Sequence, residues 1–311
     1  MARLFVFVSM VSLLVVTETA RADQHPSSIG YENLFAIRVN PLGLGDDFRA
    51  RYRIGLYDSP RATLHENFAG VVAPLLVAPS FVRPGIGIEL QPLSLLHLYV
   101  GYEPSIYFGV VGSLHSYSSP TADVGFGALQ LGGPPSMRGD LYGTTVHHLV
   151  LGATAQAAWR WLAFRSTWRA QRIEAELRNG DTVFYDPLYG ILLPRSGWMV
   201  NGETTALYRS SFGLVAGVQY VVTATWYPAS AYAAGEAHTN PNTPVQKLGP
   251  LVAYTFARQL RGRFEAPTLS LLVAWYLEDR YRAGQLVNQA IPMVGIGFSF
   301  RGTLFASSVQ K

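Results

Sequence analysis

Apolar and polar residues alternate along most of the chain beyond residue 30. Across residues 48–56 every even position is apolar or aromatic, whereas the odd positions hold Arg49, Arg51, Arg53 and Gly55. Successive side chains of a β-strand point to opposite faces. The pattern therefore predicts a strand with one apolar face and one strongly polar face.

The same alternation recurs and predicts twelve strands. They span residues 31–40, 46–57, 67–78, 81–91, 94–104, 144–157, 162–178, 182–208, 212–227, 246–257, 264–278 and 290–301. The first and third are the weakest, because Pro74 and Pro79 interrupt the third and proline lacks a ladder donor. Ten strands would remain without these two.

Three features favour a membrane barrel over a soluble sandwich. The strands run to about ten residues or more, where soluble strands usually have about five or six. Aromatic residues such as Trp198 and Trp226 fall near the ends of the apolar faces. Tight connections alternate with long polar segments at residues 113–143, 228–246 and 279–289. We therefore expect an all-β, transmembrane antiparallel up-and-down barrel with short periplasmic turns and long extracellular loops.

The first 22 residues have the features of a secretory signal peptide. Arg3 precedes the apolar run Leu4 to Val16, and Ala20-Arg21-Ala22 forms a small-x-small cleavage site. The apolar run is shorter than the ~20 residues that a membrane-spanning helix needs. We expect cleavage before Asp23, which leaves residues 23–311 as a single barrel domain.

Composition supports this class and excludes others. Hydrophobic residues make up 49% of the chain and charged residues only 14%, against roughly 25% charged in soluble domains. The chain has no cysteine, so disulfide scaffolds, thiolate metal sites and cysteine nucleophiles are excluded. The net charge of +4 is too small to indicate a nucleic-acid partner.

With this strand pattern the chain resembles the outer-membrane β-barrel proteins of Gram-negative bacteria, over essentially residues 31–305. The resemblance is to the class and not to a specific family. It implies an outer-membrane location, with outer-membrane lipids and the barrel-assembly machinery as partners. Members commonly end on an aromatic residue; here Phe298, Phe300 and Phe305 lie near the end, yet the chain continues to Lys311.

Candidate enzyme chemistry is sparse. His115-Ser116-Tyr117-Ser118 resembles the His-x-Ser arrangement of outer-membrane phospholipases, but Tyr117 stands two residues after the histidine, where that arrangement has serine. Neither Asn201 nor Asn288 has a spacing that would make it the orienting amide. We expect no enzyme, with a lipid hydrolase or acyltransferase as the minor alternative.

Metal and cofactor sites are also disfavoured. His147 and His148 are adjacent on a strand and so point to opposite faces. His97 and His148 share the inward face, but their heights differ by on the order of 14 Å. We expect no metal and no cofactor.

The inward faces carry the remaining candidates. The residues predicted to line the lumen are Arg49, Arg51, Arg53, Glu89, Glu103, His148, Arg165, Arg169, Glu203, Arg209 and Glu278. Matched heights predict an ion pair between Arg169 and Glu203. The arginine excess predicts a narrow passive pore with a mild preference for small anionic solutes. The alternative is a non-conducting structural or surface-interaction barrel with paired interior charges, and barrel size does not decide between them. The oligomeric state stays open.

Overall fold

The computed structural model describes residues 27–59, 61–109, 114–122, 142–240, 242, 244–256, 262–280 and 290–307. The expected signal peptide of residues 1–22 lies outside these ranges. None of the helices in the described ranges has both the length and the apolar character to cross a membrane.

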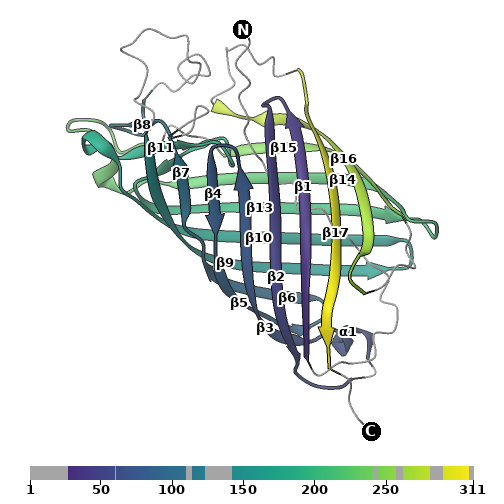
Figure 1. Ribbon diagram of the computed structural model, residues 1–311. Helices are drawn as coiled ribbons and strands as arrows, with labels where there is room; N and C mark the ends of the chain where they lie inside the picture. Colours follow the sequence, from purple (N-terminus) through teal and green to yellow (C-terminus); the bar gives the residue numbers. More distant parts are fainter. Residues whose placement is uncertain are drawn as a thin grey trace.

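Antiparallel strands form a closed barrel (Figure 1). Two pairs of strands, β4 with β5 and β6 with β7, continue one another along the wall, so the 14-stranded sheet has 12 wall positions. β1 pairs with β17 and closes the ring. The wall strands are β1 (Ser27–Val39), β2 (Gly43–Gly55), β3 (Phe68–Ala78), β4 (Phe81–Pro84), β5 (Ile86–Leu93), β6 (Leu96–Tyr102), β7 (Ser105–Phe108), β9 (Gly143–Trp159), β10 (Leu162–Ala175), β13 (Ser196–Arg209), β14 (Leu214–Trp226), β15 (Val245–Thr255), β16 (Glu265–Glu278) and β17 (Met293–Ala306). The prediction of twelve wall strands is confirmed.

Pro74 lies inside β3 and does not end it. On one side it pairs with Arg49 of β2. On the other side the ladder is broken, because β3 pairs with β5 up to Val72 and with β4 from Leu75 onward. Proline has no N–H to donate, and the partner strand is interrupted opposite it, at Gly85. An added Cβ at Gly85 would lie 2.9 Å from the Pro74 ring.

Both ends of the described chain lie at one end of the barrel, termed here the termini end, where Ser28 pairs with Ala306. Connections at this end are mostly short, although residues 56–67 between β2 and β3 include the helix α1 (Ala62–His65). At the opposite end, termed the loop end, the connections after β7, β10, β14 and β16 are long. In Figure 1 the loop end, with β8 and β11, lies at the upper left. The expected alternation of short and long connections is confirmed from β5 onward, whereas the loop-end connections after β1 and β3 are short.

Large apolar side chains point outward from every wall strand. Ile86 and Ile88 of β5 are 61% and 60% exposed, whereas Glu89, the next residue, points inward and is 1% exposed. Trp198 pairs with Trp226 near the loop end, in the position of an interfacial aromatic. An apolar outside around a polar inside is the reverse of a soluble protein, and it confirms the class-level resemblance to outer-membrane barrels.

The segment 182–208, expected as one strand, is divided. Only β13 belongs to the wall; β11 (Val183–Asp186) and β12 (Ile191–Pro194) form a hairpin that joins β8 (Ser116–Tyr117) in a second, 3-stranded sheet. Gly190 in the hairpin turn has φ +72°, a left-handed conformation that glycine adopts easily. Two 3-10 helices, η2 (Arg178–Gly180) and η3 (Ala229–Ala231), lie in the loop-end connections.

Candidate functional site

The arginine row of β2 points into the barrel, as its alternation requires, and meets carboxylates there. Glu89 of β5 is the central partner: its carboxylate lies 2.8 Å from Arg53 Nε, 3.4 Å from Arg51 Nε and 3.2 Å from His97 Nε2. The Arg53 guanidinium also stacks over the Phe68 ring at 4.1 Å. Three cationic or ionisable groups therefore share one buried carboxylate.

The other members of the row are paired as well. Arg49 Nη2 lies 2.8 Å from Asp47 Oδ2 on the same strand, and Arg51 forms a second ion pair with Glu32 of the neighbouring β1. Because each arginine of β2 has a carboxylate partner, this row stabilises the wall and adds little free positive charge to the lumen.

Two further arginines that point inward were not among the predicted lumen residues. Arg83 of β4 is 4% exposed, lies 3.3 Å from Glu103 Oε2 and donates to Gln171 Oε1 at 2.7 Å. Arg38 of β1 is 5% exposed and donates to the carbonyl of Pro187 at 3.1 Å. Arg83 stands in a four-residue strand with too few alternating positions to show its face. Arg38, in contrast, alternates with Phe35, Ile37 and Val39 of β1, a pattern that indicates its inward face.

The inward arginines of β10 differ from all of these. In the part of the chain that the structure describes, the guanidinium groups of Arg165 and Arg169 make no ion pair and no hydrogen bond, and Arg165 Nε is fully buried without a partner. The register places Arg169 opposite Asn201 and Glu203 opposite Thr167. Glu203 thus faces inward, but it lies opposite the residue two positions before Arg169 and nearer the termini end, so the expected ion pair does not form. In the described lumen, positive charge without an ion pair therefore lies on β10 and, at the termini end, on Arg209 of β13, and not on β2.

The β11–β12 hairpin folds into the loop end of the lumen. The Asp186 carboxylate shapes its turn by accepting from the backbone N–H groups of Leu188 and Tyr189 at 2.7 and 3.0 Å. Tyr107 OH of β7 donates to the same carboxylate at 3.0 Å. Gln171 of β10 donates to the Tyr189 hydroxyl at 2.6 Å.

The tip of this hairpin reaches from one side of the lumen to the other. Arg38 holds Pro187 from β1 and Gln171 holds Tyr189 from β10. These two strands stand half-way round the ring of wall strands from one another. The hairpin therefore bridges the barrel and obstructs its loop end.

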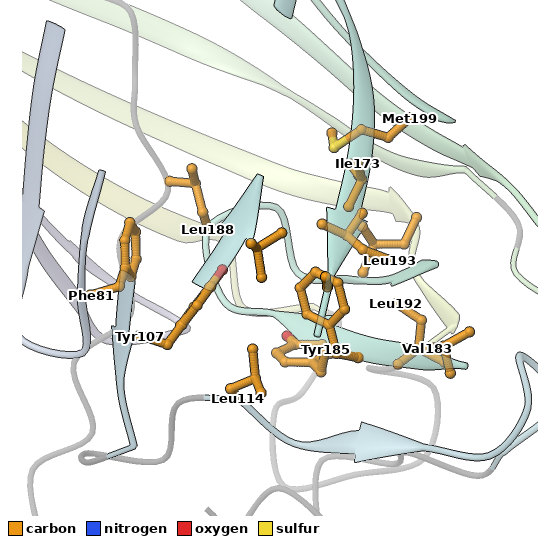
Figure 2. Close-up of a cluster of buried hydrophobic side chains, with 14 of the residues drawn as sticks. Phe81, Tyr107, Leu114, Ile173, Val183, Tyr185, Leu188, Leu192, Leu193 and Met199 are labelled. Atoms are coloured by element: carbon orange, nitrogen blue, oxygen red, sulfur yellow. The ribbon is translucent and has the colours of Figure 1, made fainter. Parts of the chain in front are cut away.

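An apolar cluster fixes the hairpin against the wall (Figure 2). Consecutive hairpin residues are buried, including Val183 with Phe184 and the run Ile191 to Leu193, because one face of the hairpin packs on the wall and the other under the outer loops. The wall contributes Phe81, Tyr107, Ile173 and Met199, among others. This part of the lumen is dry.

The loop-end connections interlock above the hairpin. Arg280 donates to the carbonyl of Pro120 at 3.1 Å and to Asn242 Oδ1 at 2.5 Å, and Asn242 donates to the Tyr227 hydroxyl at 3.0 Å. Tyr227 in turn donates to the carbonyl of Leu192 in the hairpin at 2.7 Å. Burial raises the pKa of Tyr227 above its ordinary value, so this donor keeps its proton.

A second contact joins the same loops. Ser119 and Thr121 both donate to the Glu236 carboxylate, Thr121 at 2.8 Å. These hydrogen bonds lower the pKa of Glu236 below its ordinary value.

Three predicted lumen residues remain. His148 is fully buried on the inward face of β9, 3.2 Å from Ser105 Oγ, and Arg209 ends β13 on its inward side at the termini end. The prediction that Glu278 lines the lumen is wrong, because a bulge beside Gln246 shifts the register between β15 and β16. The Gln246 side chain donates to Glu278 at 2.8 Å and accepts from Tyr220 at 2.7 Å. Tyr220 alternates with inward Gln219 and faces outward, so Glu278 lies on the outer face.

In the motif His115-Ser116-Tyr117-Ser118, the contacts of Ser116 connect neighbouring loop segments. Ser116 donates to Asp181 at 2.5 Å and accepts from Tyr142 at 2.9 Å. The candidate orienter Asn201 bonds to Thr223 at 2.8 Å on the inner wall, and Asn288 lies outside the described residues. In the described ranges no cluster of three or more His, Asp or Glu residues forms a metal site.

No protein-family model and no curated protein sequence matches the chain. Among solved structures it is similar to the NanC porin, with a TM-score of 0.39 and 8% identity over 90% of this chain and 100% of that one. It is also similar to the KdgM porin in complex with oligogalacturonate, with a TM-score of 0.38 and 7% identity over 89% and 99%. A third similar structure is the Pseudomonas putida toluene transporter TodX, with a TM-score of 0.33 and 9% identity over 90% of this chain and 89% of that one.

Proposed function

We propose that the protein is an outer-membrane channel for small solutes, seen here closed at its loop end, and that its lumen favours anions. The observation that carries the proposal is the pair of inward arginines on β10, Arg165 and Arg169, which make no ion pair with any residue that the structure describes. An unpaired guanidinium is costly in a dry interior. It is tolerated where water and mobile anions solvate it, and its potential then draws anions into the lumen.

The two ends of the barrel have different roles in this proposal. The loop end faces the outside, and the termini end, with mostly short connections, faces the periplasm. The hairpin then controls entry from outside, while the charged lumen lies on its periplasmic side.

Conductance of the purified protein in planar bilayers tests the proposal. Under a KCl gradient, the wild type should show a reversal potential of the sign for anion preference. Combining Arg165→Gln with Arg169→Gln should reduce this preference or reverse it, because the unpaired positive charge is removed. The control, Arg172→Gln, changes an outward arginine of the same strand that pairs with Glu174, and it should leave the preference unchanged. An unaltered reversal potential in the double variant would show that these arginines do not select the ion.

The second candidate is a non-conducting barrel, which the dry apolar cluster around the hairpin favours. The two candidates differ when hairpin anchors are removed. Combining Gln171→Ala with Tyr107→Phe deletes two of the anchoring hydrogen bonds. A closed channel should then open more often than the wild type, whereas a structural barrel should show no conductance in either form.

A further inference from the structure

A cavity of about 60 Å³ lies in the lumen against the hairpin tip. Leu188 and Tyr189 of the tip form part of its lining, and the rest comes from β2, β3, β4, β10, β13, β14, β15 and Glu103. One water molecule needs at least about 10–15 Å³ by this measure of volume. The cavity therefore has room for roughly four water-sized groups.

Charged side chains of both signs line the cavity, with one more positive than negative. They are Arg49, Arg83, Arg169 and Lys247 against Asp47, Glu103 and Glu203. The first two arginines have carboxylate partners within the cavity wall, at 2.8 and 3.3 Å. Arg169 has no ion pair and no hydrogen bond in the described residues. The Arg169 guanidinium therefore lines the cavity with donors that no described residue takes up.

The hairpin adds a second donor and the walls add an apolar side. The Tyr189 hydroxyl accepts a hydrogen bond from Gln171, so its own proton remains to be donated. Leu76, Leu188 and Val221 also line the cavity. A guanidinium fork suits a carboxylate in particular, because two parallel N–H groups match its two oxygens.

We propose that this cavity binds a short-chain monocarboxylate with a chain of a few carbons. The carboxylate would accept from Arg169 and Tyr189, and the alkyl chain would lie against Leu76, Leu188 and Val221. This deepens the proposed function, on which it rests, by naming the class of anion that the lumen admits. A bound carboxylate would also link the hairpin tip to β10, since Tyr189 and Arg169 belong to these two elements.

Ligand-dependent thermal unfolding of the purified full-length protein in detergent tests this site, with calorimetric titration for affinity. The probes are sodium acetate, propionate and butyrate, each compared with sodium chloride at equal ionic strength. We expect the carboxylates to raise Tm in a saturable way and chloride to leave it unchanged. Arg169→Gln should weaken binding by about tenfold or more, the loss expected for hydrogen bonds to a charged group.

Further variants separate binding from folding. Arg169→Lys retains the charge but lacks the fork and should bind with intermediate affinity, and Tyr189→Phe should weaken binding less than Arg169→Gln. Arg172→Gln, on the outer face, should bind like the wild type. Equal Tm shifts with chloride and the carboxylates, or unchanged affinity in Arg169→Gln, would overturn the proposal.

Conductance distinguishes a failure of this site from a failure of the channel. An anion-selective pore whose Tm does not respond to any carboxylate rejects the site and retains the channel. Saturable carboxylate binding in a protein that never conducts retains the site and rejects the channel.

Discussion

The contrast between paired and unpaired arginines predicts the effect of one small substitution, Glu89→Gln. The change keeps the side-chain shape but removes the charge that Arg51, Arg53 and His97 share. Removing one partner of a buried ion pair costs about 3–5 kcal/mol. Arg53 is 33% exposed and Arg51 keeps Glu32, so we expect the lower end of that range, about 3 kcal/mol.

Urea titration of the barrel in lipid vesicles, followed by the fluorescence of its 6 tryptophans, measures this loss. The matched control is Arg165→Gln, which removes a lumen charge that makes no ion pair within the described residues. Its free energy of unfolding should stay within about 1 kcal/mol of the wild type or rise. In bilayers the two variants should shift the reversal potential in opposite directions, Glu89→Gln toward anions. A stability loss below about 1 kcal/mol for Glu89→Gln, typical of solvated surface pairs, would refute the dry pairing of the β2 row.

Three further results follow from the same structure. Tyr107→Phe alone removes the hydrogen bond from the wall to Asp186 of the hairpin. It should raise the frequency of channel openings in single-channel records, but less than the combination of Gln171→Ala with Tyr107→Phe. Val218→Arg on the lipid face should destabilise the barrel by ~2–4 kcal/mol if it lies near the membrane midplane, measured by the same urea titration. Because hydrogen bonds lower the pKa of Glu236, its contact with Ser119 should persist above the ordinary carboxyl pKa and be lost as pH falls through the lowered value. Protease cleavage of residues 227–240 should then increase in acid. Glu236→Gln should remove this pH dependence.

The barrel wall was predictable because lipid on one side and a polar lumen on the other impose strict alternation. The nine residues from Phe48 to Leu56 sufficed to assign Arg49, Arg51 and Arg53 to the inner face. Pro74 weakened the prediction of β3, but a proline lacks only its own N–H, and the strand passes through it while the neighbouring strand breaks at Gly85.

The partners of the inward charges were not predictable, because pairing depends on register and tilt between strands. Asp47, at the start of the predicted alternation, neutralises Arg49, whereas Arg169, predicted to pair with Glu203, faces Asn201. Glu278 followed the alternation of β16 in sequence, but one bulge reversed its face.

The hairpin was missed although a signal was present. Val183 to Tyr185 and Ile191 to Leu193 are runs of consecutive apolar residues, which predict burial on both faces. A wall strand has only one apolar face, so these runs indicate a segment inside the barrel. Their position directly before the alternating residues of β13 made them look like its beginning.

The same runs limit how the hairpin can move. Six of its large apolar side chains are buried, namely Val183, Phe184, Leu188, Ile191, Leu192 and Leu193. At about 1.5–3 kcal/mol for each buried side chain, withdrawing the whole hairpin into water would cost on the order of 10 kcal/mol, an upper estimate. Spontaneous withdrawal would therefore be rare. Movement of the tip alone exposes far less apolar surface, because Leu188 is the only one of the six in the turn between β11 and β12.

A disulfide at the base of the hairpin distinguishes these two motions. Val183 of β11 and Tyr117 of β8 are register partners, and antiparallel partners have Cα atoms about 4.5–5.5 Å apart, within the range of a disulfide. The chain has no native cysteine, so combining Val183→Cys with Tyr117→Cys yields a single defined bond. If only the tip moves, single-channel conductance should be the same in the oxidised and reduced forms, because Pro187, Leu188 and Tyr189 stay free. Conductance that disappears on oxidation and returns with reductant would mean that the whole hairpin must leave the lumen, and that its apolar cluster is less stabilising than its burial implies.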